Sequence, residues 1–400
     1  MKRPRQRASA RLELTVLPPL AQRGRGTQAK NDRLQVLARL DGAQVLGELK
    51  TSGGKAGEWW RQVIAGHELI RAHLAGPTQS KPAPGQDELR SLGHKLFSLL
   101  FTKQVRALYE EARRARSVEL VFTSLVPWIA DKPWELLCDP RRGFVARGKV
   151  RFSRSAPSEV PARAPSPRRG AMRLLIAVAE PRGEAQLSGF EESKSIAAGF
   201  LGLEKRGLLQ ATVVQAATVS ALRGALRRDR YDVLHFVGHG GWDAKKDRGF
   251  LLFEGETGEP RRVAPDQLVS LLRARGLRLL VLNACESGRG SRKGTGVEFN
   301  RGVAPALLAA GLPAVLANQY PVFDRPAASF AERFYAALGQ GRSLSDAVHT
   351  ARISIARDRS NSPSEWAVPV LYARDPTQRL CAAPRRRWPT AALVADGVDS

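Results

Sequence analysis

A cysteine and a histidine occupy positions in this chain from which their side chains could carry out chemistry together. Cys285 follows the apolar run Leu277–Leu282, which has the composition of a buried strand of a parallel sheet. His239 ends a second apolar run, Tyr231–His239, and two glycines follow it. Ligands of open α/β sheets bind at the carboxyl ends of the strands. We therefore expect both side chains at one edge of one sheet.

A thiol and an imidazole at such an edge are the nucleophile and the general base of a cysteine hydrolase. A free thiol is mostly protonated at neutral pH, so an adjacent base is needed to favour the thiolate. His239 precedes Cys285 by 46 residues (285 − 239), close to the roughly fifty residues that separate the two in caspases. The backbone N–H groups of Gly240 and Cys285 would supply an oxyanion hole. The alternative is a buried Cys285 that acts as a small apolar residue, but the two strand ends together favour catalysis.

These two segments also carry a family resemblance. The CHAT family, a group of caspase-like cysteine peptidases related to separase and the gingipains, is similar to this chain at HFVGHGGWD and LLVLNACESG. The similarity extends upstream to DKPWELLCDP and downstream to ALLAAGLPAVLANQYPVFD and FAERFYAALGQGRSLSDAVHTAR, so it covers about residues 90–375. The resemblance implies a caspase-like fold in which His239 is the general base and Cys285 the nucleophile. It also implies a regulated bacterial protease of signalling, defence or cell-death pathways.

The chain departs from the family pattern at residues that would choose a substrate. Glu286 follows the cysteine, where the caspase signature has Gln, Arg or Gly. Asn318–Tyr320 stands where relatives often have an aliphatic or small residue together with Trp. A pocket for a basic P1 side chain, the residue before the cleaved bond, would need a carboxylate. Candidates in the sequence are Asp243, Asp247, Glu286 and Asp324. Solvated surface is the alternative for each, and Trp242 could line the cleft or pack beneath it.

Other motifs favour structural roles. His235 lies between two large apolar residues, so we predict a hydrogen-bonded core histidine rather than a second base. A zinc site built on His235, His239 and Cys285 lacks convincing further ligands, and no metal or organic cofactor is expected. The Gly-rich segment Ser287–Gly296 lacks the residue order of a phosphate-binding P-loop. We interpret it as a loop after the nucleophile, and hypothesise that it is cut at Arg292 or Lys293 on activation.

Composition limits the class of protein. The net charge is +26 and the pI near 11.0, but arginines are spread along the whole chain, so we predict no nucleic-acid partner. No apolar run is long enough to span a membrane, and the basic start lacks the apolar segment of a secretory signal. A cytoplasmic protein is therefore expected. The 3 cysteines are too sparse for a disulfide framework.

The chain is long enough for two domains, with a boundary at the Pro- and Ser-rich segment 155–170. The predicted fold class is α/β, with a caspase-like, doubly wound and mainly parallel sheet flanked by helices and preceded by a smaller mixed α/β domain. A hairpin is expected at Asp41-Gly42, and one helical period runs from Glu88 to Ala115. The predicted units are a basic N-terminal tail (1–33), an N-terminal mixed α/β domain (34–154), the linker (155–170), a peptidase domain (171–377) and a C-terminal tail (378–400).

Taken together, these features predict a cysteine endopeptidase that cleaves a protein substrate through a dyad of Cys285 and His239. The N-terminal domain is the expected site for a regulatory partner. The alternative is a caspase-like interaction or signalling module that binds a partner without cleaving it. A missing cysteine or histidine would have favoured that alternative, and both residues are present.

Overall fold

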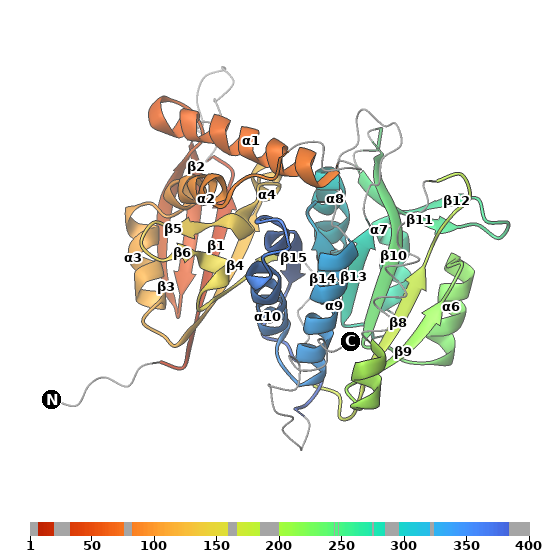
Figure 1. Cartoon of the computed structure of the whole chain (residues 1–400). Coiled ribbons are helices and arrows are strands. Elements are labelled where there is room, and N and C mark those ends of the chain that lie inside the picture. The colour runs from red at the N-terminus through yellow and green to blue at the C-terminus, as the bar shows by residue number, and fades with distance from the viewer. Residues whose placement is uncertain are drawn as a thin grey trace.

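A single large sheet organises the chain. The computed structural model describes residues 7–19, 33–75, 82–158, 166–184, 200–243, 245–246, 248–273, 276–284, 296–320 and 324–383. Its 13-stranded sheet has the order β12-β11-β10-β13-β14-β15-β7-β4-β1-β2-β3, with β8 beside β10 and β9 beside β8 (Figure 1). The strands are β1 (Ser9–Leu17), β2 (Arg33–Leu40), β3 (Ala43–Lys50), β4 (Ser117–Ser124), β7 (Val150–Ser155), β8 (Met172–Val178), β9 (Leu209–Val214), β10 (Val233–Asp243), β11 (Arg248–Glu254), β12 (Pro260–Val263), β13 (Leu279–Ala284), β14 (Ala314–Asn318) and β15 (Pro369–Ala373).

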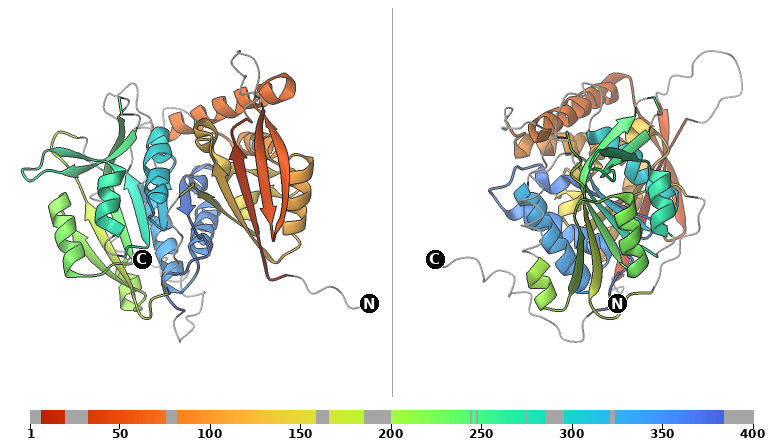
Figure 2. Two further views of the ribbon diagram at one scale, coloured as in Figure 1. Left: turned by 180° about the vertical axis from the view of Figure 1, so that it is seen from behind. Right: turned by 90° about the vertical axis from the view of Figure 1, so that its right-hand side faces the viewer.

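Helices cover both faces of the C-terminal half of this sheet and one face of the N-terminal half (Figure 2). A two-stranded sheet, β5 (Cys138–Asp139) with β6 (Gly143–Phe144), packs beside α2. The α-helices are α1 (Gly54–Ala75), α2 (Gln86–Leu100), α3 (Lys103–Ala112), α4 (Pro127–Ala130), α6 (Val219–Arg228), α7 (Pro265–Arg273), α8 (Gly296–Ala309), α9 (Asp324–Gly339) and α10 (Leu344–Arg357), and the short 3₁₀ helices are η1 (Trp134–Leu136), η2 (Val145–Arg147) and η3 (Glu365–Ala367).

Side-chain alternation along the central strands decides which helices pack on which face. In β10, Val233 and Val237 belong to one hydrophobic core, whereas Leu234 and Phe236 belong to another. The first core contains residues of α9 and α10, and the second contains residues of α6, α7 and α8. A strand buried on both faces must be apolar at nearly every position, which explains its continuous apolar run. The predicted α/β class, with a mainly parallel sheet flanked by helices, is confirmed.

The N-terminal strands form their own part of the sheet. Strands β2 and β3 pair as the predicted hairpin, and the turn residues Asp41 and Gly42 both have positive φ, 48° and 89°. Strand β1 lies between β2 and β4, and its alternate residues Leu12, Leu14 and Val16 are fully buried. The expectation of an N-terminal tail is therefore wrong for Ser9–Leu17, because this apolar alternation pairs with strands far along the chain.

The C-terminal end of the described chain is also packed against the fold. Leu380 and Cys381 are fully buried. The Arg278 guanidinium donates hydrogen bonds of 2.6 Å to the carbonyl oxygens of Arg379 and Leu380. The predicted tail from residue 378 is thus wrong as far as these residues are concerned.

The two halves of the chain meet within the sheet rather than at a separate interface. Strand β7 of the N-terminal half pairs in parallel with β15 of the C-terminal half, with Arg154 facing Tyr372. One hydrophobic core contains residues from both halves. The predicted boundary at 155–170 therefore separates two parts of one sheet, and the division into independent domains remains a prediction. None of the helices formed by the described residues is long and apolar enough to cross a membrane.

Helix α2 approaches the chain around η1 so closely that one helical position needs glycine. A Cβ atom built on Gly93 would lie 2.1 Å from the carbonyl oxygen of Leu136 and 2.6 Å from Cβ of Cys138. We expect Gly93→Ala to lower the free energy of unfolding by about 1–3 kcal/mol, as overpacking does. Urea unfolding measures this change. Gly224→Ala in α6 is the matched control, because a Cβ there meets nothing within 4 Å, and should stabilise by about 0.5–1 kcal/mol. Equal effects of the two substitutions would contradict the packing argument.

Candidate active site at the sheet edge

Strand β10 changes partners at the residue predicted to be the base. It pairs in parallel with β13 from Val233 opposite Leu279 up to Gly238 opposite Ala284. From His239 to Asp243 it pairs instead with β11 in an antiparallel hairpin. The strand was expected to end at His239 and continues four residues further, because β11 folds back on it. His239 is thus the first residue beyond the parallel pairing.

The structure describes some of the remaining predicted site residues fully and others in part or not at all. His239 is buried, with 5% of its surface exposed, and Gly240 pairs with Leu251 in the hairpin. Trp242 lies opposite Gly249 in the same hairpin and Asp324 begins α9, but the side chains of Trp242 and Asp324 are outside the described part of the chain. Three further predicted residues, Asp247, Cys285 and Glu286, lie outside the described residues, as does the loop with the hypothetical cleavage positions Arg292 and Lys293.

Asp243 has a local structural role. Its Oδ1 accepts hydrogen bonds from the backbone N–H groups of Lys246 at 3.2 Å and Lys245 at 3.1 Å. These bonds stabilise the ionised form and lower the pKa of the Asp243 carboxyl. The carboxylate therefore closes the turn between β10 and β11, which leaves its predicted role in substrate binding as a prediction.

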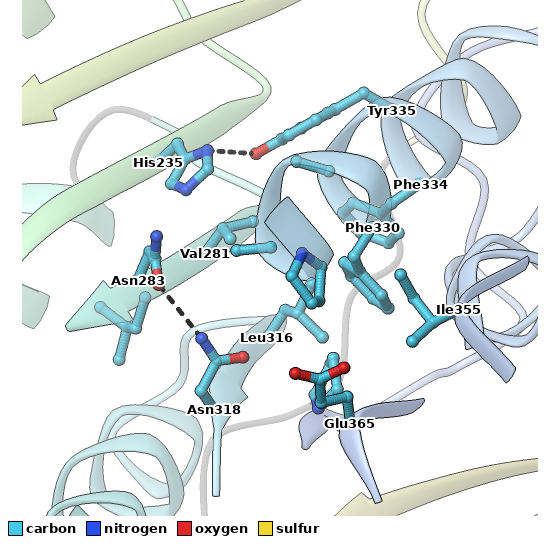
Figure 3. Close-up of a pocket in the computed structure, with 15 residues that line it drawn as sticks. His235, Val281, Asn283, Leu316, Asn318, Phe330, Phe334, Tyr335, Ile355 and Glu365 are labelled. Atoms are coloured by element: carbon cyan, nitrogen blue, oxygen red, sulfur yellow. Dashed lines mark hydrogen bonds between the residues drawn. The ribbon is translucent and has the colours of Figure 1, made fainter. Parts of the chain in front are cut away.

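A pocket lies behind the sheet edge, between the sheet and α9 (Figure 3). It contains about 40 Å³ of space accessible to water. Apolar side chains such as Leu316 and Phe330 form most of its wall. Its polar lining residues come from five elements and are His235, Asn283, Asn318, Tyr335 and Glu365. Asn283 and Glu365 were not predicted as site residues, although the strand alternation in the sequence places Val281 and Asn283 on one face.

His235 closes the inner end of this pocket as a neutral histidine. Its Nδ1 forms a 3.1 Å hydrogen bond with the hydroxyl of Tyr335, and only 2% of the residue is exposed. Burial lowers the pKa of His235 to about 4. The prediction of a hydrogen-bonded core histidine is confirmed. Its Nε2 has no hydrogen-bond partner among the residues that the structure describes.

The outer end of the pocket is more polar. Asn283 of β13 and Asn318 of β14 are neighbours in the sheet, and the Asn318 side-chain amide donates a 3.1 Å hydrogen bond to Oδ1 of Asn283. Glu365 of η3 accepts a 2.7 Å hydrogen bond from the backbone N–H of Ser362. Burial raises the pKa of the Glu365 carboxyl to about 6, so the group is mainly ionised at neutral pH.

The N-terminal half holds the residue that follows Asn318. The Gln319 amide donates to the carbonyl oxygen of Asp131 at 3.1 Å and accepts a 2.8 Å hydrogen bond from the Arg154 guanidinium. Arg154 forms a fully buried ion pair with Glu135 and also donates to two backbone carbonyls. Glu135 pairs with Arg154 because a buried guanidinium needs a counter-charge.

The other two cysteines are unsuited to nucleophilic chemistry. Cys138 and Cys381 are fully buried free thiols. Burial raises the pKa of Cys138 to about 11 and that of Cys381 to about 12, which keeps both protonated at neutral pH. Among the described residues, no cluster of three or more His, Cys, Asp or Glu side chains could hold a metal ion.

Breaking the buried ion pair should destabilise the whole fold. We expect Arg154→Met to lower the free energy of unfolding by about 3–5 kcal/mol, because the buried Glu135 would lose its hydrogen-bonded partner and keep only the Arg352 guanidinium, 3.8 Å away. The exposed pair of Arg325 and Asp358, 3.3 Å apart, supplies the control. Arg325→Ala should change stability by less than about 0.5 kcal/mol. Urea unfolding measures both changes. Similar losses in the two variants would show that the buried ion pair contributes no more to stability than the exposed one.

The neutral state of His235 predicts a dependence of stability on pH. The unfolded histidine gains a proton below about pH 6.5, whereas the folded one resists protonation down to about pH 4. Stability is therefore lost as the pH falls through this window. Between pH 7.5 and 4.5 the histidine should cost about 2–3 kcal/mol. The fall in urea-unfolding free energy over that range should be smaller by about this amount in His235→Gln, and equal falls in the variant and the wild type would refute the assignment.

Comparisons with known proteins address the family. No curated protein sequence was found to match the chain. Among solved structures, separase in its securin complex from Saccharomyces cerevisiae is 12% identical, with a TM-score of 0.49 over 91% of this chain and 30% of that chain. The Arg-specific cysteine proteinase gingipain R is 12% identical, with a TM-score of 0.40 over 77% of this chain and 70% of that chain. The present chain thus spans under a third of the separase chain.

The family of the chain follows from a comparison of its sequence with models of known protein families. The family model of the CHAT domain matches residues 90–374. This range begins in α2 and ends just after β15, so it includes the strands β10, β13 and β14 that form the candidate site. The match covers most of the chain, and the protein therefore belongs to the CHAT domain family.

Proposed function

We propose that the protein is a cysteine endopeptidase in which Cys285 is the nucleophile and His239 the general base. The observation that carries this proposal is the register of two neighbouring strands. Strands β10 and β13 pair residues that are 46 positions apart, as Gly238 with Ala284. His239 and Cys285 are separated by the same 46 positions, so each directly follows one member of that pair.

This register supports a direct interaction of the two side chains. Neighbouring parallel strands lie about 4.8 Å apart, and residues in register project to the same face. His239 belongs to the same alternation as His235, which faces the pocket. In the sequence, Cys285 is two positions beyond Asn283, which also faces the pocket, so a strand continued by one residue would present both side chains on one face. An imidazole and a thiol in these positions could share a proton, as a nucleophile and its base must.

The proposed reaction is hydrolysis of a peptide bond. The Cys285 thiolate attacks the carbonyl carbon, and the backbone N–H groups of Gly240 and Cys285 hold the resulting oxyanion. The His239 imidazolium donates its proton to the departing amine, which leaves a thioester on Cys285. Water, deprotonated by His239, then cleaves the thioester and releases the acid product. Each proton taken up is returned, so the enzyme ends in its starting state.

The contacts that the N-terminal half makes near the sheet edge support a regulatory role for this part of the chain. It holds Gln319 through Asp131 and Arg154, and the ring of His67 in α1 meets the ring of Tyr320 edge-on, with centroids 5.5 Å apart. Gln319 and Tyr320 directly follow β14 at the sheet edge. We propose that a partner bound to the N-terminal half would act on the site through this segment, in a bacterial signalling, defence or cell-death response.

The function is tested by cleavage of a proteome. The full-length wild type, Cys285→Ala and His239→Ala are incubated with a cell extract, and new peptide termini are counted by mass spectrometry. We expect cleavage by the wild type and a loss of roughly a thousandfold or more in both variants, because the two residues act as a unit. His94→Ala, at a partly exposed histidine of α2, is the control and should cleave normally.

Two outcomes would contradict the proposal. Equal cleavage by the wild type and Cys285→Ala would assign the activity to a contaminating protease. No cleavage, with retention of a protein from the extract by wild type and variants alike, would favour the alternative of an interaction module.

A further inference from the structure

We infer that the pocket behind the sheet edge receives the P1 side chain of the substrate and selects a short, uncharged one. This inference rests on the proposed function, because it assigns the pocket to a peptide held at Cys285. It concerns only the side chain that precedes the cleaved bond. Its basis is the position, size and charge of the pocket lined by Asn283, Asn318, Phe330 and Glu365.

The position of the pocket relative to the proposed nucleophile comes from strand alternation. Val281 and Asn283 of β13 both line the pocket, and they are two residues apart on one face of the sheet. The next position of this series is 285. With Cys285 as the nucleophile, the attacked carbonyl carbon would lie at the carboxyl end of β13, beside the face that Asn283 lines. The P1 side chain is the one bonded next to that carbonyl, so the pocket is within its immediate reach.

The size of the pocket limits which side chains it admits. A single buried water needs about 10–15 Å³ of such space, and the pocket has about 40 Å³. This corresponds to roughly three or four heavy atoms, as in valine, threonine, asparagine or leucine. Arginine, lysine and the aromatic residues are longer or wider. Phe330 of α9 stacks on Phe334, with ring centroids 5.7 Å apart, and these paired rings close the wall that a larger side chain would have to displace.

Charge excludes acidic side chains of the right size. The titratable lining residues are His235, Tyr335 and Glu365. His235 and Tyr335 bind each other as neutral groups at the inner end. The neighbouring Arg325 pairs with Asp358, so Glu365 supplies the charge of the pocket itself. An aspartate at P1 would place a second carboxylate beside Glu365, and like charges at short range in a buried site repel strongly.

Uncharged polar groups at the mouth favour a side chain with a hydrogen-bonding end. Asn318 uses one amide hydrogen on Asn283, and an amide has a second hydrogen to donate. At the inner end, Nε2 of His235 has no partner among the described residues. A threonine or asparagine side chain could accept a hydrogen bond from Asn318 at the mouth, whereas valine and leucine would pack against the apolar wall. The pocket therefore favours short uncharged residues as a class.

The test measures cleavage and binding of the same peptides. Their sequence, taken from a site cut in the proteome experiment or from a random library, is varied only at P1. Cleavage is followed with the full-length wild type, and affinity with full-length Cys285→Ala. We expect kcat/KM for P1 valine, threonine, asparagine or leucine to exceed that for arginine, aspartate or phenylalanine by about tenfold or more. The dissociation constants should rank the peptides in the same order.

Two substitutions change the pocket in defined ways. Phe330→Leu enlarges it and should raise kcat/KM for P1 phenylalanine or methionine several-fold relative to valine. Phe101→Leu is the matched control, because Phe101 is also a buried, stacked phenylalanine, on Phe97 of the N-terminal half, and its P1 profile should stay that of the wild type. Glu365→Gln removes the charge and should raise cleavage after aspartate relative to asparagine.

The outcomes separate this inference from the proposed function. Cleavage that depends on Cys285 but prefers arginine or aspartate at P1 would overturn the pocket assignment alone. An unchanged P1 profile in both Phe330→Leu and Glu365→Gln would do the same, since the cavity would then be an internal packing gap. Absent cleavage with the expected order of binding affinities would reject the peptidase and retain the pocket. Absent cleavage with no P1 preference in binding would overturn both.

Discussion

The fold requires Glu135 and Arg154 to stay paired, because both charges are buried. Both side chains are buried, with 3% of Arg154 and 0% of Glu135 exposed, and an unpaired charge in such a place is strongly unfavourable. Arg154 belongs to β7 at the point where this strand pairs with β15, so the ion pair sits at the junction of the two halves of the sheet. The same guanidinium binds Gln319, which directly follows β14. The junction and the candidate site are therefore stabilised by one set of contacts.

This arrangement explains why one continuous sheet suits the proposed chemistry. A dyad that spans two strands needs those strands to keep a fixed register, because a slip of one residue would turn a side chain to the opposite face. Strands β10 and β13 are buried between α9 and α10 on one side and α6, α7 and α8 on the other. The apolar side chains that pack against these helices fix the register. The glycine-flanked His239 follows where the parallel pairing ends.

Local patterns in the sequence predicted much of this fold, and long-range contacts account for the rest. The Asp41-Gly42 turn and the apolar run before Cys285 are local signals, and both predicted the elements found. The continuous helical period over 88–115 did not reveal that α2 and α3 are separate helices. The helix ends there because the Phe101 ring stacks on Phe97 and packs against Tyr109. The ring centroids are 4.4 and 4.7 Å apart, respectively. The hydrogen bond between Asn318 and Asn283 likewise joins residues distant in sequence, so the alternation of β13 placed Asn283 on one face without revealing its partner.

The nucleophilic role proposed for Cys285 can be measured as the reactivity of its thiol as a function of pH. The buried Cys138 and Cys381 make alkylation of the folded protein report on Cys285. The rate of reaction with iodoacetamide, followed by mass spectrometry of the peptide containing Cys285, gives the apparent pKa of that thiol. We expect a pKa well below the usual value of about 8.5 in the wild type, and a return toward that value in His239→Ala. An ordinary thiol pKa that is identical in both proteins would contradict that role.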